Sequence, residues 1–144
     1  MPFLRRVGAV YLIAVAVVVA VFFIVNTFLD DTLDVLQVWY VLDVLMLIAL
    51  AVALIFNYSR KMGAGGRDPE AGVTLRYLEV NVVFYVTAAV TILFLHNWFS
   101  LLAQGGDSLD GNHQAWVIWA FVDTALPLVV GVTGCALWRE ADSP

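Results

Sequence analysis

The sequence predicts an all-α fold, a bundle of four transmembrane helices in a single domain. Apolar residues make up 62% of the 144-residue chain and charged residues only 13%, whereas a soluble domain has about 45–50% apolar and about 25% charged residues. Four segments also reach the length of about 20 apolar residues that a bilayer requires. These runs show no alternation of apolar and polar residues, and this absence favours helices over the strands of a barrel.

The four predicted spans cover residues 7–28, 36–58, 78–99 and 115–138. The first follows Arg5 and Arg6, as a secretory signal would, but its apolar run is longer than the roughly 7–15 residues of a signal core. It also ends in bulky side chains without a small-residue cleavage site, so we expect a retained helix. Two short polar loops and one longer glycine-rich loop, residues 59–73, connect the spans.

The basic residues predict the orientation of the bundle. All seven fall on one side of a four-span topology: Arg5, Arg6, Arg60, Lys61, Arg67, Arg76 and Arg139. The loops on the other side have no basic residue and carry Asp30, Asp31, Asp34, Asp107 and Asp110. By the positive-inside rule we expect both termini and the glycine-rich loop in the cytoplasm, and the chain in a bacterial cytoplasmic membrane.

The two halves of the sequence align with each other, which predicts a tandem repeat of two helical hairpins. The first and third spans match at an offset of 71 residues, and the second and fourth at an offset of 80. The matched pairs include Asn26 with Asn97, Trp39 with Trp119, and Asp43 with Asp123. Each half crosses the membrane twice, so the repeats would be parallel and related by an axis along the membrane normal. Chance matching in so biased a composition is the alternative.

Asp43 and Asp123 are the principal candidate site residues. Each follows a tryptophan, Trp39 or Trp119, by four positions, which places acid and indole on one helix face. Asp43 lies about four residues, roughly 6 Å, from the middle of its span. A carboxylate there costs on the order of 2.5–3.5 kcal/mol on insertion scales, and no basic residue lies within the spans to pair with it.

Three arrangements would lower that cost. The carboxyls are neutral, or they share a proton across the repeat axis, or a partner subunit or bound cation supplies positive charge. In the simplest interpretation they are protonated and hydrogen-bond a neighbouring helix. Pro127 has no N–H to donate to the carbonyl of Asp123, four residues earlier, so it leaves this carbonyl without its helical hydrogen bond and predicts a kink there. Gly131 and Gly134 follow, and predict a close helix approach on the cytoplasmic side.

Helical spacing predicts one inward face for each middle span. For the second span this face comprises Trp39, Asp43, Met46, Leu50, Ala53 and Asn57, and for the third Arg76, Glu79, Val83, Val86, Val90, Leu93 and Asn97. Arg76 and Glu79 are expected to form an ion pair at the cytoplasmic rim. Asn26 and Asn97 are expected to end the first and third spans as polar groups of the intramembrane site.

His96, beside Asn97, is a candidate haem ligand, but a bis-histidine site would need a second membrane histidine from a partner chain. The loop that holds Asp107, Asp110 and His113 lacks the order of a calcium-binding loop, so no metal and no cofactor is expected. The glycine-rich loop lacks the Gly-Lys-Ser/Thr of a phosphate loop, which argues against a nucleotide. The net charge of −5 argues against nucleic acid, and the single cysteine, Cys135, excludes an internal disulfide.

These patterns favour a non-catalytic accessory subunit of a larger membrane complex, whose partners are the lipid bilayer and other integral membrane subunits. The chain has no catalytic constellation and almost nothing outside the predicted bilayer, so we do not expect an enzyme. The first alternative is a small proton- or ion-coupled transporter that uses Asp43 and Asp123 as carriers. The second is a redox anchor that binds haem or quinone near His96.

Overall fold

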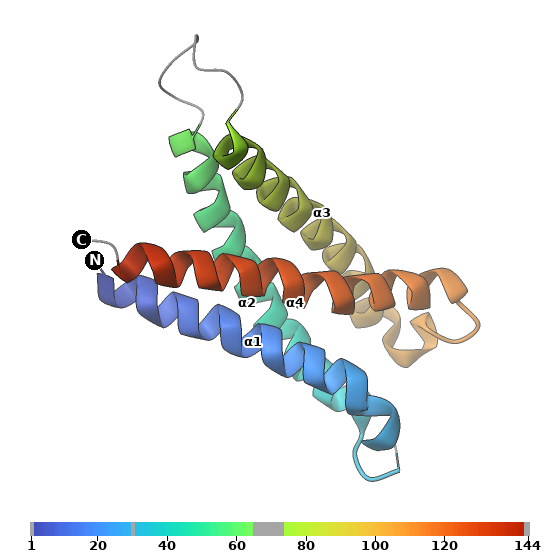
Figure 1. Cartoon of the computed structure of the whole chain (residues 1–144). Coiled ribbons are helices and arrows are strands. Elements are labelled where there is room, and N and C mark those ends of the chain that lie inside the picture. Colours follow the sequence, from blue (N-terminus) through green and yellow to red (C-terminus); the bar gives the residue numbers. More distant parts are fainter. Residues whose placement is uncertain (1, 30, 65–73, 143–144) are drawn as a thin grey trace.

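The computed structural model describes residues 2–29, 31–64 and 74–142; residue 30, residues 65–73 and the chain ends lie outside the description. The described residues form four α-helices and a short 3-10 helix, and no strand (Figure 1). The helices are α1 (Pro2–Leu29), α2 (Val35–Ala64), α3 (Leu75–Gln104) and α4 (His113–Asp142), with η1 (Gly105–Ser108) between the last two. All four are long and apolar enough to cross a membrane. The all-α, four-helix prediction is therefore confirmed.

Each helix extends beyond the apolar segment that predicted it. The first begins at Pro2 rather than near residue 7, and the third ends at Gln104 rather than near residue 99. Residues 59–64, which we expected in the glycine-rich loop, form the last turns of α2, while the rest of that loop, Arg67 included, lies outside the described residues. Hydropathy marks the part of a helix that would lie in lipid, whereas the polar turns beyond it are helical without being apolar.

Side-chain caps mark where three of the helices begin. The Asp34 carboxylate accepts a hydrogen bond from the backbone N–H of Gln37 (3.2 Å), and the Thr74 hydroxyl accepts one from Tyr77 (3.2 Å). Asn112 does the same for Ala115 (3.1 Å) before α4. Each cap satisfies one of the backbone donors that a helix N-terminus leaves without a partner. The caps thus stabilise helix starts at both ends of the bundle.

The first and last helices form the most extensive helix pair. They lie side by side and antiparallel, so the start of α1 and the end of α4 are neighbours (Figure 1). Small residues allow the close approach: a Cβ added to Gly134 would lie 2.9 Å from Cγ1 of Ile13 and 3.2 Å from the carbonyl oxygen of Ala9. At the end of this pair, Arg6 donates to Asp142 over 2.7 Å. The predicted close approach at Gly134 is confirmed.

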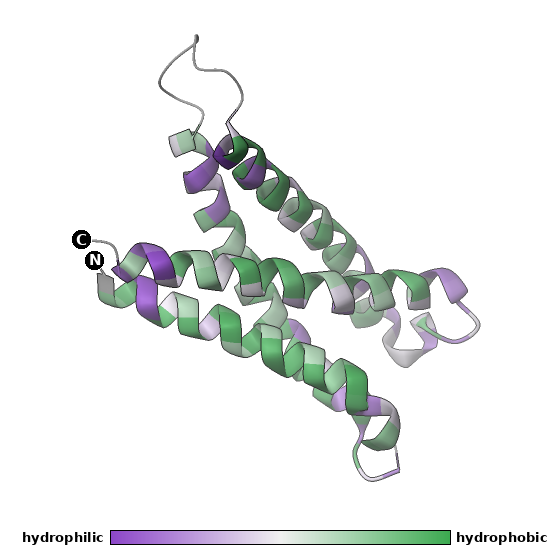
Figure 2. Cartoon of the chain, in the orientation of Figure 1, coloured by the Kyte–Doolittle hydropathy of each residue, from purple (hydrophilic) through white to green (hydrophobic). Residues whose placement is uncertain are grey.

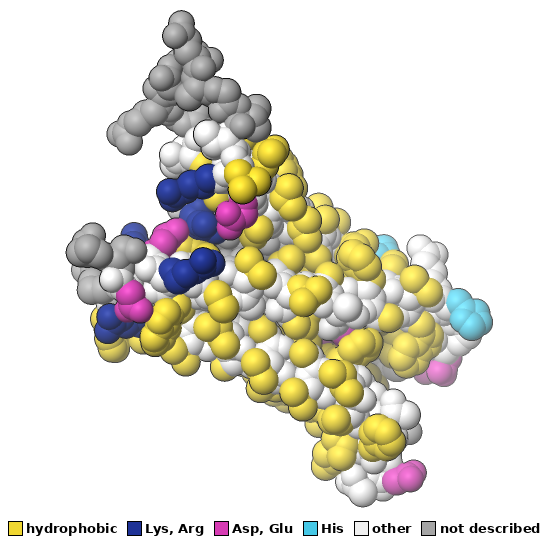
Figure 3. Space-filling model, viewed as in Figure 1, with side chains coloured by type: hydrophobic (Ala, Val, Ile, Leu, Met, Phe, Trp, Pro, Cys, Tyr) yellow, Lys and Arg dark blue, Asp and Glu magenta, His cyan; other side chains and the backbone are white. Residues whose placement is uncertain are grey.

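Charged residues gather at the helix ends. Figure 2 shows apolar residues along all four helices, with hydrophilic ones mainly towards their ends. In the face shown in Figure 3, Lys and Arg lie together at one end, which we call the basic end (residues 2–6, 60–64, 74–79 and 139–142). The opposite end, with residues 31–34 and 105–112, we call the loop end. The basic residues of the described chain therefore gather at one end of the helices, as the sequence predicts.

The outward surface of the helices is apolar. Ile24, Ile55, Ile92 and Val117, one from each helix, are each 68–70% exposed. A water-soluble monomer rarely carries apolar surface that continues around the whole molecule. This surface suits contact with lipid chains.

The predicted inward face of α2 is confirmed. Asp43, Met46, Leu50, Ala53 and Asn57 are all buried, and Trp39 is half-buried against the core.

The predicted inward face of α3 is confirmed only at Val90 and Asn97, which are buried, and is wrong at its other positions. Val86 is exposed and Val83 only half-buried. The buried face is instead Val80, Thr87, Val90, Phe94, Asn97 and Leu101. Thr87 turns inward because Asn57 of α2 donates a hydrogen bond to its hydroxyl (3.3 Å). A helix that is apolar nearly all round gives no periodic signal from which its buried face could be chosen.

Candidate functional site

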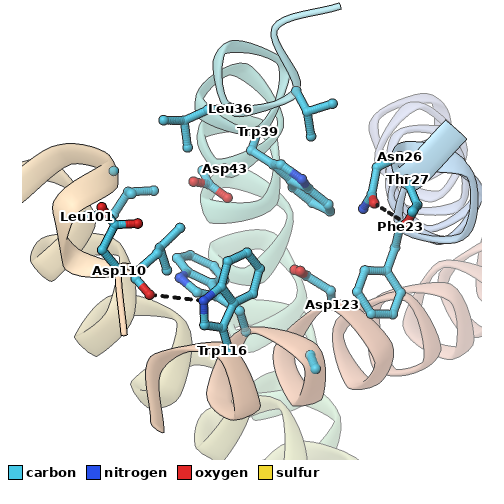
Figure 4. A pocket seen from close by; sticks show the side chains of 15 residues that line it. Phe23, Asn26, Thr27, Leu36, Trp39, Asp43, Leu101, Asp110, Trp116 and Asp123 are labelled. Carbon is cyan, nitrogen blue, oxygen red and sulfur yellow. Dashed lines mark hydrogen bonds between the residues drawn. The ribbon is translucent and has the colours of Figure 1, made fainter. Parts of the chain in front are cut away.

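A pocket of about 550 Å³ lies among the helices at the loop end. All four α-helices contribute to its wall, together with η1 and the residues that follow it (Figure 4). Thr27 and Asp110, which line the pocket, are exposed, so it is reached from the loop-end surface. A pocket of this size is within the range that binds small molecules.

The two candidate acids converge on this pocket from different helices. Asp43 comes from the inward face of α2 and Asp123 from that of α4. Their residues are 1% and 6% exposed, and in Figure 4 both carboxyl groups point into the same space. Sequence spacing identified each acid separately, and the fold brings them together. The two acids face a pocket within the protein rather than the lipid.

Three of the four carboxyl oxygens are buried and have no hydrogen-bond partner. They are Oδ1 and Oδ2 of Asp43 and Oδ1 of Asp123. No Lys, Arg or His of the described chain lines the pocket. A buried carboxylate without a partner is strongly unfavourable, and two in one pocket also repel each other. The site therefore has an unmet requirement for positive charge, which a proton or a bound cation would supply.

Aromatic rings form a large part of the wall. Trp39 and Trp119 both line the pocket, as their spacing from the two acids predicts. Trp39 packs edge-on against Phe22 with ring centroids 5.1 Å apart, and Trp119 packs in the same way against Phe94 at 6.0 Å. These contacts stabilise the orientation of both indoles.

Several pocket residues were not predicted from the sequence, among them Phe23, Asp110 and Trp116. The indole N–H of Trp116 donates to the carbonyl oxygen of Leu109 over 3.0 Å, which fixes this ring at the mouth. Trp116 is more exposed than Trp119, and by position it is typical of an interfacial tryptophan. Its role in the pocket depends on the path of the 105–112 segment, which hydropathy does not predict.

The structure places only one of the two predicted asparagines, Asn26 and Asn97, in the pocket. Asn26 lines the pocket, and its Oδ1 accepts a hydrogen bond from the Thr27 hydroxyl. Asn97 lies elsewhere, two turns before the end of α3, where its amide donates to the carbonyl oxygen of Ala115 over 3.0 Å. Asn97 therefore joins α3 to α4 and is not part of the pocket. His96 is exposed on α3 and does not line the pocket either.

Pro127 lies one turn beyond Asp123 towards the basic end and is buried. The helix continues through it from His113 to Asp142. Proline has no N–H, so the carbonyl of Asp123 receives no hydrogen bond from the residue four positions later. The freed acceptor and the carboxyl thus belong to the same residue of the pocket.

The expected ion pair between Arg76 and Glu79 is not formed. Both side chains are exposed in the first turns of α3, and the described chain places no ion pair between them. The basic end is connected by other contacts. Arg60 of α2 lies 3.1 Å from the Glu140 carboxylate of α4, and Lys61 donates to the Tyr85 hydroxyl of α3 over 2.7 Å. Contacts between helices are formed here in preference to a local pair.

A second polar cluster lies nearer the basic end, and sequence analysis identified only one of its members. Asn57 of α2 donates to the hydroxyls of Thr133 in α4 (2.9 Å) and Thr87 in α3 (3.3 Å). Both threonines in turn donate to carbonyls of their own helices, over 2.7 and 2.6 Å. Threonine is common in apolar helices with only this local bond, so its spacing gave no signal. The cluster joins three helices.

The described residues contain no group of three or more His, Cys, Asp or Glu side chains placed to hold a metal ion. The acidic residues that line the pocket are Asp43, Asp123 and the exposed Asp110. No protein family, curated protein or solved structure matches the chain.

Proposed function

We propose that the chain is an integral membrane protein that takes up a cation in the pocket at its loop end, and that it is a small proton- or cation-coupled transporter. Asp43 and Asp123 are the residues that carry the charge. The observation that supports this function is the convergence of two buried carboxyls, three of whose oxygens have no partner, on a pocket open at one end.

The proposed location follows from surface and charge. Helices long and apolar enough to span a bilayer, with an apolar outer surface, favour insertion in a bacterial cytoplasmic membrane. The basic end would face the cytoplasm and the loop end the periplasm. The pocket would then open to the periplasm, so cations would reach the carboxyls from outside.

The tandem repeat belongs to the same proposal. The pairs Trp39 with Trp119 and Asp43 with Asp123 contribute to one pocket from α2 and α4, as two related hairpins would provide. Transporters built from repeats commonly place the substrate site where the repeats meet. An α2–α4 relation of this kind would allow the two halves to move against each other around the acids.

An apolar layer separates the pocket from the basic end. Met46 and Leu50 of α2 and Leu126 and Val130 of α4 are fully buried beyond the two acids. In a transporter this layer would close the cytoplasmic side while the periplasmic side is open. Movement of α4 at Pro127, where one backbone bond is missing, would be the simplest way to open it.

The accessory-subunit interpretation remains a second proposal, with less support from the geometry. A partner helix could not pack directly on Asp43 and Asp123, because both are buried within the bundle. A partner would instead have to extend a basic side chain through the pocket mouth. A haem or quinone site at His96 has no such support, since this side chain is exposed and lies outside the pocket.

The test is flux in vesicles reconstituted with the purified protein. We expect proton or monovalent-cation flux that Asp43→Asn and Asp123→Asn each reduce at least tenfold, because each variant keeps the shape of the side chain and removes its charge. Asp107→Asn, an exposed acid of the same loop end that does not line the pocket, is the matched control. Flux that is absent in the parent protein, or unchanged in the double variant, would exclude the transporter.

A further inference from the structure

We propose that the ligand of the pocket is an organic ammonium ion with an aromatic or other apolar substituent, bound with its charge between Asp43 and Asp123 and its apolar part against the tryptophans. This inference rests on the proposed cation-binding function and names the class of cation. It follows from three properties of the pocket: its size, its unpaired charge and its aromatic wall.

The size of the pocket is much greater than a bare ion requires. Its volume is about 550 Å³, whereas one water molecule takes about 30 Å³ of liquid. A desolvated sodium ion or a proton would leave most of this space without a partner. A substituted ammonium ion would occupy it and would bury the apolar wall.

The charge of the pocket selects a cation with few ligand requirements. Asp43 and Asp123 present three buried oxygens without donors. An ammonium group needs only nearby negative charge and, where it carries N–H, acceptors for those donors. Calcium, in contrast, takes six to eight oxygen ligands. No other charged side chain of the described pocket wall is available apart from the exposed Asp110.

The wall of the pocket suits both parts of such an ion. The indoles of Trp39, Trp116 and Trp119 line it. Figure 4 shows the first two of these rings in the same pocket as the two carboxyls. The face of an indole is the most favourable aromatic surface for a cation, and its large area also packs against an apolar substituent. Contacts with Phe22, Phe94 and the carbonyl of Leu109 already hold the three rings in place. Binding would therefore require little ordering of the wall.

The arrangement also predicts how the ligand lies. The carboxyls are buried and Trp116 is exposed at the mouth. The ammonium group would therefore enter first and lie deepest, with the apolar part towards the loop end. A ligand with the same shape but no charge would leave the carboxyls without a counter-charge and would bind poorly.

The test compares benzyltrimethylammonium with neopentylbenzene, its neutral analogue of the same shape, by calorimetric titration of the full chain in lipid nanodiscs. Empty nanodiscs and the Asp43→Asn/Asp123→Asn double variant correct for partition into lipid. We expect saturable binding of the ammonium ion, weakened at least tenfold in the double variant and several-fold in Trp39→Leu, and no saturable binding of the neutral analogue. Asp107→Asn should bind like the parent.

Three results would overturn the inference. Equal binding of the ammonium ion to the parent and the double variant would show that the carboxyls do not recognise it. Absence of saturable binding, with proton or sodium flux that still depends on Asp43 and Asp123, would exclude the organic ligand and leave the proposed transporter in place. Loss of both binding and flux in the parent would exclude the two proposals together. Circular dichroism of each variant verifies that it is folded.

Discussion

The side-chain amide of Asn57 donates a hydrogen bond to the Thr133 hydroxyl over 2.9 Å, while its own oxygen Oδ1 is buried without a donor in the described structure. Asn57 therefore joins α2 to α4, while its side-chain carbonyl oxygen remains an unsatisfied acceptor. This cluster lies fourteen residues from Asp43 along α2, roughly 21 Å at 1.5 Å per residue. It is separate from the pocket, so its contribution to stability can be measured independently.

The first prediction concerns this cluster. Thr133→Val removes the 2.9 Å acceptor of Asn57, and Thr87→Val removes the 3.3 Å acceptor. Each variant keeps the volume of the side chain. We expect Thr133→Val to lower the free energy of unfolding by about 1 kcal/mol and Thr87→Val by less, because the shorter bond has the better geometry.

Unfolding in detergent followed by circular dichroism measures both effects. Thr91→Val is the control, because Thr91 only donates to the carbonyl of Thr87 in its own helix. A loss in Thr91→Val as large as that in Thr133→Val would mean that the bonds between helices contribute nothing.

The second prediction concerns the α1–α4 pair. Gly134→Ala places a methyl group within 2.9 to 3.2 Å of Ile13, Leu12 and Ala9. Because one of these contacts is a backbone oxygen, the helices would have to separate, and we expect a loss of about 1–3 kcal/mol. Gly131→Ala is the control, since its Cβ would lie 3.5 Å from that of Ala16, an ordinary contact.

Thermal unfolding of the two alanine variants distinguishes these cases. If the Gly134→Ala protein were as stable as Gly131→Ala, α1 and α4 would be farther apart at Gly134 than the structure shows.

The third prediction is that the pocket acids reduce the stability of the ligand-free protein. Asp43→Asn keeps the shape of a side chain whose two oxygens are both buried without a partner. Removal of that charge should raise the free energy of unfolding by about 1–3 kcal/mol while it weakens cation binding. Asp107→Asn, which changes an exposed acid, should leave the stability within about 0.5 kcal/mol.

Chemical unfolding without added organic cation measures this gain. An Asp43→Asn protein no more stable than its parent would indicate that the carboxyl is already neutral in the empty pocket.

The fourth prediction concerns the orientation in the membrane. Cys135→Ser removes the only cysteine. Thr32→Cys then marks the loop end, and Ser59→Cys, directly before Arg60, marks the side of the basic end. Both positions are exposed. In intact bacterial cells with a permeabilised outer membrane, a maleimide that does not cross the inner membrane should label Thr32→Cys alone.

Disruption of the inner membrane should then make Ser59→Cys reactive as well, which serves as the control for its accessibility. Labelling of Ser59→Cys in intact cells would reverse the proposed orientation, and the pocket would open to the cytoplasm.

The fold and the two acids could be predicted from the sequence because each produces a strong physical signal. Continuous apolar runs predict the four helices, and Asp43 and Asp123 stand out because charged residues are rare in such runs. Asp43 and Asn57 also mark the inward face of α2, since polar side chains in an apolar helix turn away from lipid. The inward direction of Asp43 could therefore be predicted from the sequence, whereas no inward face was predicted for the helix that carries Asp123.

The remaining features depend on relations between distant residues. The buried face of α3 includes Thr87 because of a partner in α2, and Asn97 reaches the backbone of α4 rather than the pocket. Trp116 belongs to the pocket only because the segment after η1 places it at the mouth. Such relations are determined by packing and leave no periodic pattern in a helix that is apolar on every side.

The pairing of α1 with α4 has a consequence for biogenesis. During synthesis α1 leaves the ribosome well before α4, so the surface around Ala9 and Leu12 that receives Gly134 stays without its native partner until three more helices have been made. The bundle can close only late, when Arg6 and Asp142 meet. Until then lipid or insertion factors would have to cover the surface of α1 around Ala9 and Leu12. A product arrested before α4 would be an expected target of membrane proteases.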